Sequence, residues 1–475
     1  ARLDSVPIVA ITGQVAMPLI GTDAFQEVDT QGLSIPVTKH TFLVRTPEHL
    51  ARVLPEAFDI AERGRPGPVV IDVPRDVQTQ SLDFHGFAPD APSPQIMCPD
   101  EGAIEQIAEM INRSKRPVIY AGGGIVASGA SGALAMLARR ASIPVSLTLM
   151  GLGCFPPDDP LCLGMLGMHA NVSTNLALAE SDLLLAIGVR FDDRATGRVR
   201  EFCRHATVIH IDIDRSEIDK IKKSNVSLIS DAGMALQSLL PRIEGQSRSA
   251  WRKRVAHLRA LHEPDNRGDD DPFHPERVLR HLAKSAPENA IVATDVGQHQ
   301  MWAARSFPVR RPRSFLTSGG LGTMGFGLPA AIGAALANPG ARVICVSGDG
   351  SFMMNMQELA TLADHGLDVT VIVMNNGGLG LVRQQQQLFY GGRFCASAFA
   401  TSPDFPALAQ SFGVRALSLS GVSDPSGAIA RAMRVKGPLL IDLPVARNFN
   451  ALPMVPPGKS NVEMITGGAH EKRHH

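Results

Sequence analysis

The stretch that decides the fold runs from Gly348 to Asn376 and reads GDGSFMMNMQELATLADHGLDVTVIVMNN. The apolar run RVICVSGDG leads into it and the run VTVIVMNN closes it, so each end is typical of a β-strand. The segment between them, Phe352 to His365, is rich in Met, Leu and Ala, with Ser351 placed to cap its start and Gly366 to follow its last turn. The stretch therefore predicts a strand, a helix and a second strand.

Polar residues stand at the two strand ends of this unit. If the strands are parallel neighbours, the crossover from Asp349 to Asn376 (376 − 349 = 27 residues) brings both residues to the carboxyl edge of the sheet. A carboxylate, an amide oxygen and a nearby backbone carbonyl, which we place at Gly378, suit Mg²⁺, and the helix start favours an anion. The unit predicts a magnesium-bound diphosphate site in which Gly348, Gly350 and Ser351 line the anion. The alternative is that Asp-Gly and Asn-Asn are only turns.

The rest of the chain repeats this alternation of short β-rich runs with longer Ala- and Leu-rich segments, which indicates an α/β protein with parallel sheets flanked by helices. A proline-rich segment, 84–101, and a charge-dense segment, 244–277, have the composition of linkers. They divide the 475 residues into blocks at 1–83, 102–243 and 278–455, followed by a polar tail at 456–475. We therefore expect three domains.

Composition excludes several classes of function. Lys plus Arg equals Asp plus Glu at 46 each, so no net charge favours nucleic acid or an anionic membrane. The six cysteines form no CxxC pair, which argues against a zinc knuckle or a disulfide framework and fits a cytoplasmic location. No apolar run approaches the roughly 20 residues of a membrane span. The composition is that of a globular protein without a nucleic-acid or membrane partner.

The GDG and NN pair, one strand-helix-strand unit apart, is similar to the thiamin-diphosphate motif. Further segments narrow the resemblance: GTDAFQEVD, KHTFLV, GRPGPVVIDVPRD, GVRFDDRATG, TDVGQHQMWAA, SGGLGTMGFGLPAAIGA and PMVPPG. In this order, from about residue 5 to residue 463, they resemble the catalytic large subunit of acetolactate synthase, a transferase. The resemblance implies a pyrimidine-binding first block, a central FAD-binding block and a diphosphate-binding third block.

The reaction implied by the resemblance condenses two pyruvates to 2-acetolactate with loss of CO₂, or pyruvate with 2-ketobutyrate to 2-aceto-2-hydroxybutyrate, at the first common step of branched-chain amino-acid biosynthesis. The implied cofactors are thiamin diphosphate, Mg²⁺ and FAD, the flavin being structural. A homodimer or homotetramer and a small regulatory subunit are the implied assembly. Two rivals stay open: another flavin-containing relative such as pyruvate oxidase or glyoxylate carboligase, and a catalytically inactive subunit.

The third block carries the thiamin-diphosphate contacts that the resemblance implies. Met324 is the apolar wedge that holds the cofactor bent, with Gly322 in the same loop. The diphosphate contacts are Val296, Gly297, Gln298 and His299. For His299 the alternative is a structural histidine. The spacing of Gly320, Gly322 and Gly325 also matches GxGxxG, but the preceding RRPRSFLT is a poor central strand, so a Rossmann interpretation fails.

The middle block contains a strand, PVIYAGGG, that runs into three glycines, and their N–H groups are placed to approach a pyrophosphate. By itself this signal is equally consistent with a tight turn. The resemblance makes the block the FAD-binding domain and implies these flavin contacts: Arg65, Gly122, Gly123, Gly124, Thr148, Leu149, Leu166, Gly167, Met168, His169, Gly188, Arg190, Asp192, Asp212 and Asp231. Ala170 stands where the family usually has glycine, so the local backbone is expected to differ.

Substrate recognition requires a cation for the carboxylate of a 2-keto acid, and the resemblance assigns it to Arg194 in RFDDR. The alternative for Arg194 is a structural salt bridge with a neighbouring Asp. Gln14 and Arg75, the latter in place of the family's usual lysine, are implied near the reaction centre, as is Met168. Gln385 replaces a tryptophan that favours 2-ketobutyrate, which indicates acetolactate formation, although the run Gln384 to Gln387 also suits an ordinary polar helix face.

One family residue has no counterpart. A glutamate near the start of the first domain protonates the cofactor's pyrimidine ring in these enzymes, and no carboxylate here stands in a matching segment. We therefore expect an N-terminal portion to be missing from the sequence, and the chain alone to lack this acid/base group.

Overall fold

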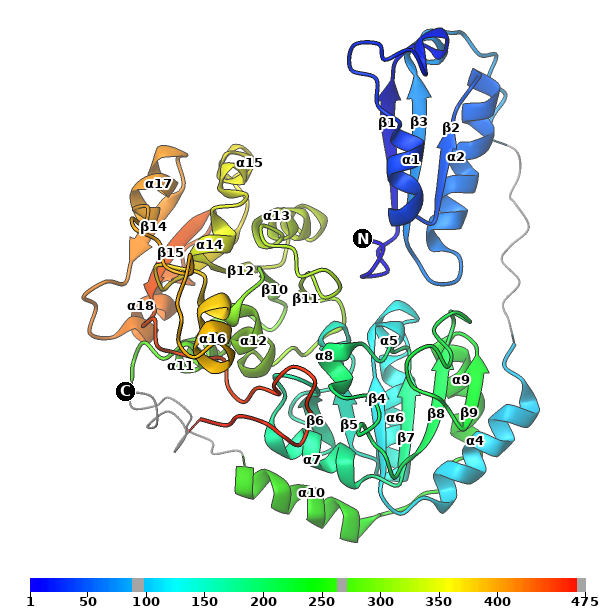
Figure 1. Ribbon diagram of the computed structural model, residues 1–475, viewed down its shortest axis with the longest axis vertical. Helices are drawn as coiled ribbons and strands as arrows, with labels where there is room; N and C mark the ends of the chain where they lie inside the picture. Colours follow the sequence, from blue (N-terminus) through cyan, green and yellow to red (C-terminus); the bar gives the residue numbers. More distant parts are fainter. Residues whose placement is uncertain (88–97, 263–270, 468–475) are drawn as a thin grey trace. The chain divides into compact units, whose positions relative to one another are not determined.

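A computed structural model describes residues 1–87, 98–262 and 271–467 of the chain (Figure 1). The contacts divide it into two compact units, Ala1–Cys98 with Gly319–Leu321, and Pro99–Ser318 with Gly322–His475. The predicted linkers at 84–101 and 244–277 and the predicted tail at 456–475 lie partly outside the described residues. Among the helices of the described residues, none is long and apolar enough to cross a membrane.

The first unit contains a three-stranded parallel sheet in the order β1-β3-β2. The strands are β1 Ile8–Gln14, β2 His40–Leu43 and β3 Pro68–Pro74, and the helices are α1 Thr30–Ser34, α2 Pro47–Glu62 and α3 Arg75–Gln78. The Thr46 hydroxyl caps α2, and Val53, Ala57 and Ala61 form its buried face because they recur at helical spacing. This small core holds the strand ends that carry Gln14 and Arg75.

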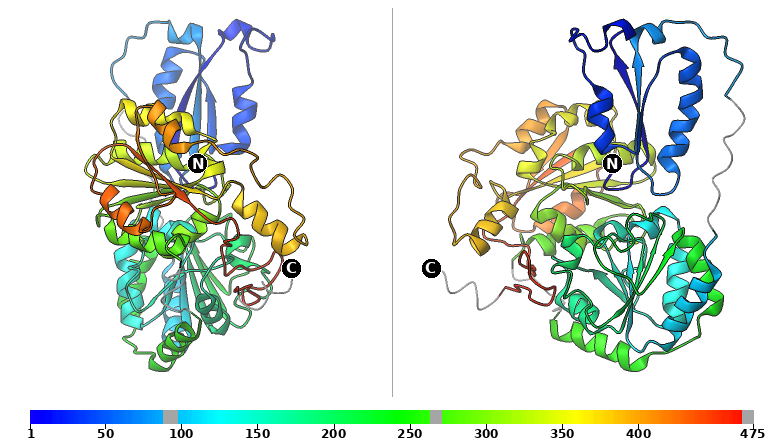
Figure 2. Two further views of the ribbon diagram at one scale, coloured as in Figure 1. Left: turned by 90° about the vertical axis from the view of Figure 1, so that its left-hand side faces the viewer. Right: turned by 45° about the vertical axis from the view of Figure 1, so that its right-hand side comes forward.

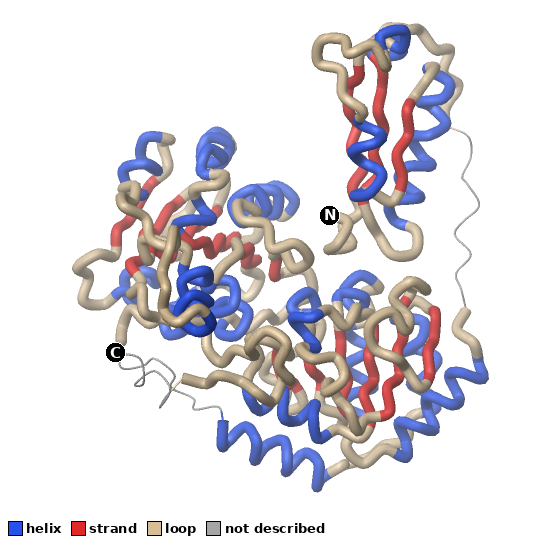
Figure 3. Tube along the Cα trace, viewed as in Figure 1, coloured by secondary structure: helices blue, strands red, loops and turns tan. Residues whose placement is uncertain are grey.

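The central sheet of the second unit has six parallel strands in the order β6-β5-β4-β7-β8-β9. They are β4 Pro117–Ala121, β5 Val145–Leu147, β6 Cys162–Met165, β7 Leu183–Ile187, β8 Thr207–Asp212 and β9 Val226–Ile229. Alternate strand residues pack into two separate clusters, so both faces are covered, as the nearly continuous apolar runs require. Figures 2 and 3 show helices on both sides of these strands.

The helices of this sheet divide between its two faces. Ile119 and Leu185 pack with α4 Glu101–Arg113, α6 Ser131–Ala141 and α9 Ala232–Leu239. On the other face Tyr120 and Leu184 pack with α7 Val172–Glu180 and α10 Ser249–His262. The short helices α5 Gly123–Ala127 and α8 Asp193–Thr196 follow strands β4 and β7.

Helix α10 lies inside the segment 244–277 that the sequence predicted as a linker. Its residues Trp251, Val255 and Leu258 are buried in the core of the central sheet. Their spacing of four and three residues is that of one helix face, which the surrounding charges concealed. This part of the segment therefore belongs to the packed structure.

The third sheet, also in the second unit, has six parallel strands in the order β11-β10-β12-β13-β15-β14. The strands are β10 Ile291–Thr294, β11 Phe315–Leu316, β12 Val343–Gly348, β13 Val369–Asn375, β14 Arg415–Ser418 and β15 Leu439–Pro444. The helices are α11 Pro275–Ser285, α12 Gln298–Ser306, α13 Gly327–Ala337, α14 Asp349–Phe352, α15 Leu359–Asp364, α16 Gly380–Phe389, α17 Phe405–Ser411 and α18 Pro425–Ala432. The predicted α/β fold with parallel sheets flanked by helices is confirmed.

The stretch from Gly348 to Asn376 joins two parallel neighbouring strands, β12 and β13, with Gly348 beside Met374. The single helix predicted between them is wrong, because the chain instead forms α14, a 3₁₀ turn at Met356–Glu358, and α15. Asn355 interrupts it: its backbone leaves the helical region and its amide donates to the Gly325 carbonyl (2.8 Å). Gly366 does follow the last helix with a positive φ of 55°.

Candidate functional site

The candidate site lies at the carboxyl edge of the third sheet, where β10, β12 and β13 end. The chain leaves β10 toward β11 on one side and leaves β12 toward β13 on the other, so the strand order reverses between β10 and β12. Loops that diverge in this way open a crevice at the strand ends, where α/β sheets bind ligands. The residues at this switch point are Asp295 to His299 and Gly348 to Ser351.

Asp349 is the carboxylate of this edge, and it is 2 % exposed. Its Oδ1 accepts a hydrogen bond from the Gly350 N–H (2.8 Å), and its Oδ2 accepts one from the Gly378 N–H (2.9 Å). Burial raises the pKa of Asp349 because the charged form loses its hydration. A cation beside the carboxylate would offset this cost.

Asn376 lies two residues before Gly378, and its Oδ1 is buried without a hydrogen-bond partner in the described structure. An unpartnered buried amide oxygen is uncommon and points to a missing ligand. The fold therefore brings Asp349, Asn376 and Gly378 together, as the sequence predicted, and their oxygens suit a hard cation such as Mg²⁺. Among the described residues no group of three or more His, Cys, Asp or Glu side chains gathers to hold a metal.

Ser351 does not cap a helix start as the sequence predicted. The helix begins at Asp349, and Ser351 is buried within it with its hydroxyl donating to the Val296 carbonyl (2.7 Å). Because Val296 belongs to the loop after β10, this bond joins the two loops of the switch point.

His299 packs against the glycines of both loops. A Cβ atom added at Gly297 would lie 2.8 Å from His299 Cε1, and one added at Gly348 would lie 2.8 Å from His299 Nδ1. Burial lowers the pKa of His299 to about 4, although Asp295 nearby acts in the opposite direction. The imidazole is therefore neutral at pH 7, and its buried Nε2 has no hydrogen-bond partner among the described residues. It is a polar atom available to a ligand at this edge.

Met324 lies close to the glycine of the Asp-Gly pair. A Cβ added at Gly350 would meet Leu379 Cδ2 at 2.6 Å and Met324 Cε at 3.8 Å. The loop that carries Met324 has Gly322 and Gly325 at positive φ, 64° and 90°. The short edge strand β11 precedes this loop, which agrees with rejecting the Rossmann interpretation of its glycine spacing.

Asp295 is a site residue to which the sequence reasoning gave no role. It is 1 % exposed; its Oδ1 accepts from the Gly325 N–H (2.9 Å), and its Oδ2 accepts from the Gly327 N–H (3.2 Å) and the Ser347 hydroxyl (3.3 Å). It thereby fixes the Met324 loop to the end of β12. Its position at the end of a buried strand, like that of Asp349, was the available signal.

Of the three glycines after β4, Gly122 and Gly124 lie beside the end of β7. Gly122 N–H donates to the Ile187 carbonyl (3.0 Å), and Gly124 N–H donates to the Gly188 carbonyl (3.2 Å). A Cβ at Gly124 would lie 2.5 Å from the Gly188 Cα, and one at Gly122 would overlap the Gly188 carbonyl. Gly122 and Gly124 are required because two backbone segments touch there, whereas a Cβ at Gly123 would meet only Met150, at 3.4 Å from its Cβ.

Other predicted flavin residues lie at carboxyl ends of the same sheet. The Thr148 hydroxyl follows β5 and is buried without a partner in the described structure. Asp192 and Asp231 cap the starts of α8 and α9, which gives each a structural task. Leu149, Leu166, Arg190 and Asp212 also follow or end strands of this sheet.

The loop after β6 contacts the end of the third block. His169 Nδ1 lies 3.1 Å from the Ala451 carbonyl, and Val455 N–H donates to the Met168 carbonyl (2.8 Å). Burial, followed by the charge of Arg305, lowers the pKa of His169 to about 4. Ala170 has no positive φ and its N–H donates to the Gly167 carbonyl (3.2 Å), so alanine fits here without strain.

The predicted substrate residues differ in exposure. Arg194 is exposed and forms an ion pair with Asp193 (3.6 Å), which exposed groups hold only weakly. Met168 N–H donates to the Arg194 carbonyl (2.7 Å), so these two residues are neighbours. Gln385 is exposed on α16, whereas Gln384 beside it is fully buried, so the run is not an ordinary polar face.

Three of the predicted site residues, Gln14, Arg65 and Arg75, belong to the first unit. Gln14 donates to Asp72 Oδ2 (3.0 Å) and to the Val28 carbonyl (2.9 Å) at the ends of β1 and β3. Arg65 Nε donates to the Ser5 hydroxyl (3.0 Å). Arg75 is exposed at the start of α3.

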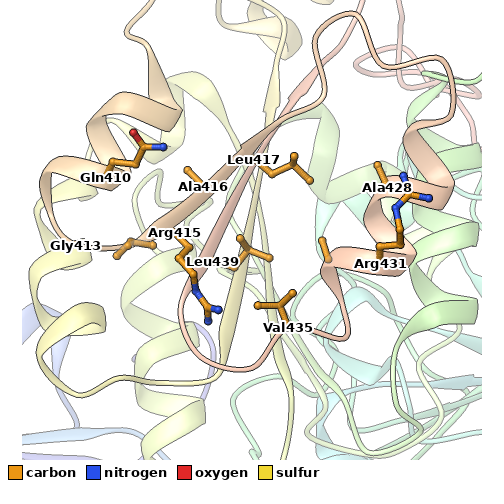
Figure 4. Close-up of a pocket in the computed structure, with 11 residues that line it drawn as sticks. Gln410, Gly413, Arg415, Ala416, Leu417, Ala428, Arg431, Val435 and Leu439 are labelled. Atoms are coloured by element: carbon orange, nitrogen blue, oxygen red, sulfur yellow. The ribbon is translucent and has the colours of Figure 1, made fainter.

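A separate cavity of about 790 Å³ opens at the β14 edge of the third sheet (Figure 4). Aliphatic side chains of β14, β15 and α18 line it, with Arg415 and Arg431 among them. It shares no lining residue with the switch-point site. The cavity lies beside the edge strand β14 and not at the carboxyl ends of β10, β12 and β13.

Comparison with known proteins agrees with this geometry. Residues 295–443 match the C-terminal TPP binding domain of thiamine pyrophosphate enzymes, and residues 104–239 match their central domain. The fold, the switch-point site and these matches make the chain a thiamine pyrophosphate enzyme.

Individual relatives show to which family of thiamine pyrophosphate enzymes the chain belongs. The chain is 48 % identical over 468 residues to the acetolactate synthase isozyme 1 large subunit of Escherichia coli (strain K12), covering 98 % of this chain and 82 % of that protein. It is 43 % identical over 466 residues to the isozyme 2 large subunit of the same organism, covering 98 % and 84 %. It is 44 % identical over 478 residues to the probable acetolactate synthase large subunit of Methanocaldococcus jannaschii, covering 96 % and 80 %. The chain belongs to the acetolactate synthase large subunit family, which decides against pyruvate oxidase and glyoxylate carboligase.

Proposed function

We propose that this chain forms 2-acetolactate from two pyruvates, with loss of CO₂, using thiamin diphosphate and Mg²⁺ at the switch point of the third sheet. The observation that carries the proposal is the buried Asp349 carboxylate beside the unpartnered Asn376 Oδ1. The Gly378 backbone carbonyl is the third protein ligand. These groups match the oxygen ligands that Mg²⁺ takes when it also binds substrate phosphates.

The protein groups around the metal have distinct tasks. His299, neutral at pH 7, offers its free Nε2 to the diphosphate, and the N–H groups at the start of α12 face the same anion. Val296, Gly297 and Gln298 complete this contact, and Met324 with Gly322 shapes the apolar wall. Bound thiamin diphosphate supplies the electron sink for loss of CO₂ from a 2-keto acid.

Substrate binding falls to the exposed Arg194, whose weak pairing with Asp193 leaves its guanidinium available to a 2-keto acid carboxylate. Gln385, exposed on α16, leaves room at the acceptor position for pyruvate as well as 2-ketobutyrate. Gln14, Arg75 and Met168 act near the reaction centre in this proposal. Release of the acetolactate product then supplies the synthesis of branched-chain amino acids.

The central sheet holds FAD in a structural role. Support comes from the unpartnered Thr148 hydroxyl and from the strand ends at which the predicted flavin residues gather. We also place the protein in the cytoplasm as a homodimer or homotetramer, with a small regulatory subunit as partner, since its relatives are named large subunits.

The test is an assay of the purified chain with Mg²⁺, thiamin diphosphate, FAD and pyruvate. Acid converts 2-acetolactate to acetoin, and acetoin that depends on both added Mg²⁺ and thiamin diphosphate is the expected result. Oxygen consumption without acetoin would contradict the proposal, because it would indicate a pyruvate oxidase. If the chain bound thiamin diphosphate but formed no product, the alternative of a catalytically inactive subunit would replace the proposal.

A further inference from the structure

The residues from Phe449 to Val455 form a segment after β15, drawn in red in Figure 1 and called the 449–455 segment below. The Ala451 N–H donates to Gln384 Oε1 (2.7 Å), and Gln384 Nε2 donates back to the Ala451 carbonyl (3.3 Å). A single side chain therefore satisfies both backbone groups of Ala451. Gln384 is fully buried, so water is not available to replace these bonds.

The same amide of Gln384 also holds Gln298, one of the four predicted diphosphate contacts. Gln298 Nε2 donates to Gln384 Oε1 (2.8 Å) and to the Phe449 carbonyl (2.9 Å). Gln298 is 4 % exposed, and these two bonds fix which way its amide faces. Its orientation thus depends on Gln384 and on the 449–455 segment.

The other end of the Gln298 amide points into the candidate site. Gln298 Oε1 is buried and has no partner in the described structure. A Cβ added at Gly380 would touch both Gln298 Oε1 and Asn376 Nδ2, so the two amides lie beside each other around that glycine. The unpartnered oxygen therefore stands next to the proposed metal ligand Asn376, where a bound water or ligand hydroxyl would satisfy it.

The 449–455 segment continues this network to the central sheet. The Ala451 carbonyl that accepts from Gln384 also lies 3.1 Å from His169 Nδ1. Val455 N–H donates to the Met168 carbonyl (2.8 Å). A continuous set of hydrogen bonds thus joins Gln298, Gln384, Ala451 and His169.

We propose that Gln384 is a positioning residue: it orients Gln298 toward the diphosphate site and anchors the 449–455 segment, without touching the cofactor itself. The inference rests on the proposed function, because it assumes that the switch-point site binds thiamin diphosphate with Mg²⁺. Removing the Gln384 amide leaves Gln298 Nε2 with one bond fewer and the Ala451 N–H buried without a partner. Both losses favour a different orientation of Gln298 and a looser segment.

The experiment compares Gln384→Met, which keeps the shape and removes the hydrogen bonds, with Gln384→Glu, which keeps an acceptor for Gln298 and Ala451. Affinity for thiamin diphosphate is titrated at saturating Mg²⁺ in the full chain. We expect Gln384→Met to weaken binding about tenfold and Gln384→Glu to recover part of this as the pH falls and the buried acid becomes neutral. Gln410→Ala, an exposed glutamine on α17, is the control and should leave affinity unchanged.

A double-mutant cycle separates positioning from general destabilisation. If Gln384 acts through Gln298, Gln384→Met should change affinity less than twofold in a Gln298→Met background. An equal tenfold loss in both backgrounds, or no loss in the single variant, would overturn the inference.

Hydrogen exchange tests the anchoring without cofactor. Gln384→Met should increase exchange at residues 449–455 of the cofactor-free chain, and unchanged exchange there would overturn this part. Failure of the unmodified chain to bind thiamin diphosphate in the presence of Mg²⁺ would instead contradict the proposed function, and the exchange result would still decide whether Gln384 anchors the segment.

Discussion

Glycines border the predicted phosphate sites at the strand ends of both the third sheet and the central sheet, but they serve different contacts in the two sheets. At Gly297 and Gly348 the missing side chains make room for the His299 ring, and unpartnered polar atoms of His299 and Asn376 face the same edge. At Gly122, Gly124 and Gly188 the missing side chains let two backbone segments touch each other. A glycine-rich strand end therefore marks close packing in both places, and a ligand is indicated instead by buried polar atoms without a partner in the described structure, which are His299 Nε2 and Asn376 Oδ1 in the third sheet and the Thr148 hydroxyl in the central sheet.

The largest expected effect is a loss of thiamin-diphosphate affinity at the third sheet. Asp349→Ala removes the only carboxylate among the proposed metal ligands and should weaken Mg²⁺-dependent thiamin-diphosphate binding about a thousandfold, or about 4 kcal/mol. Flavin content should be unchanged, because the central sheet is untouched. Titration of thiamin diphosphate together with the flavin absorbance measures both.

Asp364→Ala is the control for this variant, since Asp364 is exposed at the end of α15. It should bind the cofactor like the unmodified chain. If Asp349→Ala retained its thiamin-diphosphate affinity, the metal would have to be held elsewhere. The third sheet would then no longer differ from the central sheet by having a metal-bound diphosphate site.

The second effect is on the central sheet. Gly124→Ala places a Cβ 2.5 Å from the Gly188 Cα, so one backbone segment must move. We expect a loss of about 3 kcal/mol in the free energy of unfolding, together with loss of flavin, while thiamin-diphosphate affinity changes little. Urea unfolding followed by fluorescence measures the stability.

Gly132→Ala is a matched control in α6, because a Cβ there meets nothing within 4 Å. It should be neutral or slightly stabilising. If Gly124→Ala were equally harmless, the close backbone contact with Gly188 would not explain why glycine occurs there.

A smaller effect is expected from pH. The pKa of His169 is lowered to about 4 in the folded chain, against an ordinary value of 6.5. Below pH 6.5 the unfolded state binds the proton and the folded state does not, so stability is lost as the pH falls from 6.5 toward 4. At pH 5 this loss is about 2 kcal/mol.

His169→Gln should flatten this part of the profile, which unfolding titrations between pH 7 and pH 5 would measure. The pKa of His299 is lowered to about the same value, so a second contribution of the same sign should remain in that variant. A profile identical to that of the unmodified chain would show that His169 is not the group responsible.

Much of the fold could be predicted from the sequence, and the errors have physical causes. Long apolar runs such as those of β4 and β12 were recognised because both sheet faces are buried, whereas two- to four-residue strands such as β11, β5 and β14 are too short to show a period. The helix after Asp349 was predicted too long because the Asn355 bond to Gly325 is a tertiary contact. The same applies to the site: Asp349 and Asn376 follow from strand ends, and Asp295 carries the same signal directly after β10, but Gln384 is identified only by a partner, Ala451, that lies 67 residues away in the sequence.

The smallest effect is expected at Ala170, where the family pattern suggested that glycine is preferred. The residue is fully buried, has no positive φ and takes part in an ordinary turn with Gly167. Ala170→Gly should therefore lower the free energy of unfolding by less than about 1 kcal/mol, because glycine is more flexible in the unfolded chain. Flavin content should not change, and both quantities can be measured beside Gly124→Ala. A clear gain in stability or in flavin binding would show that Ala170 strains the loop after β6. Glycines at the strand ends of the central sheet would then be explained better by ligand binding than by backbone packing.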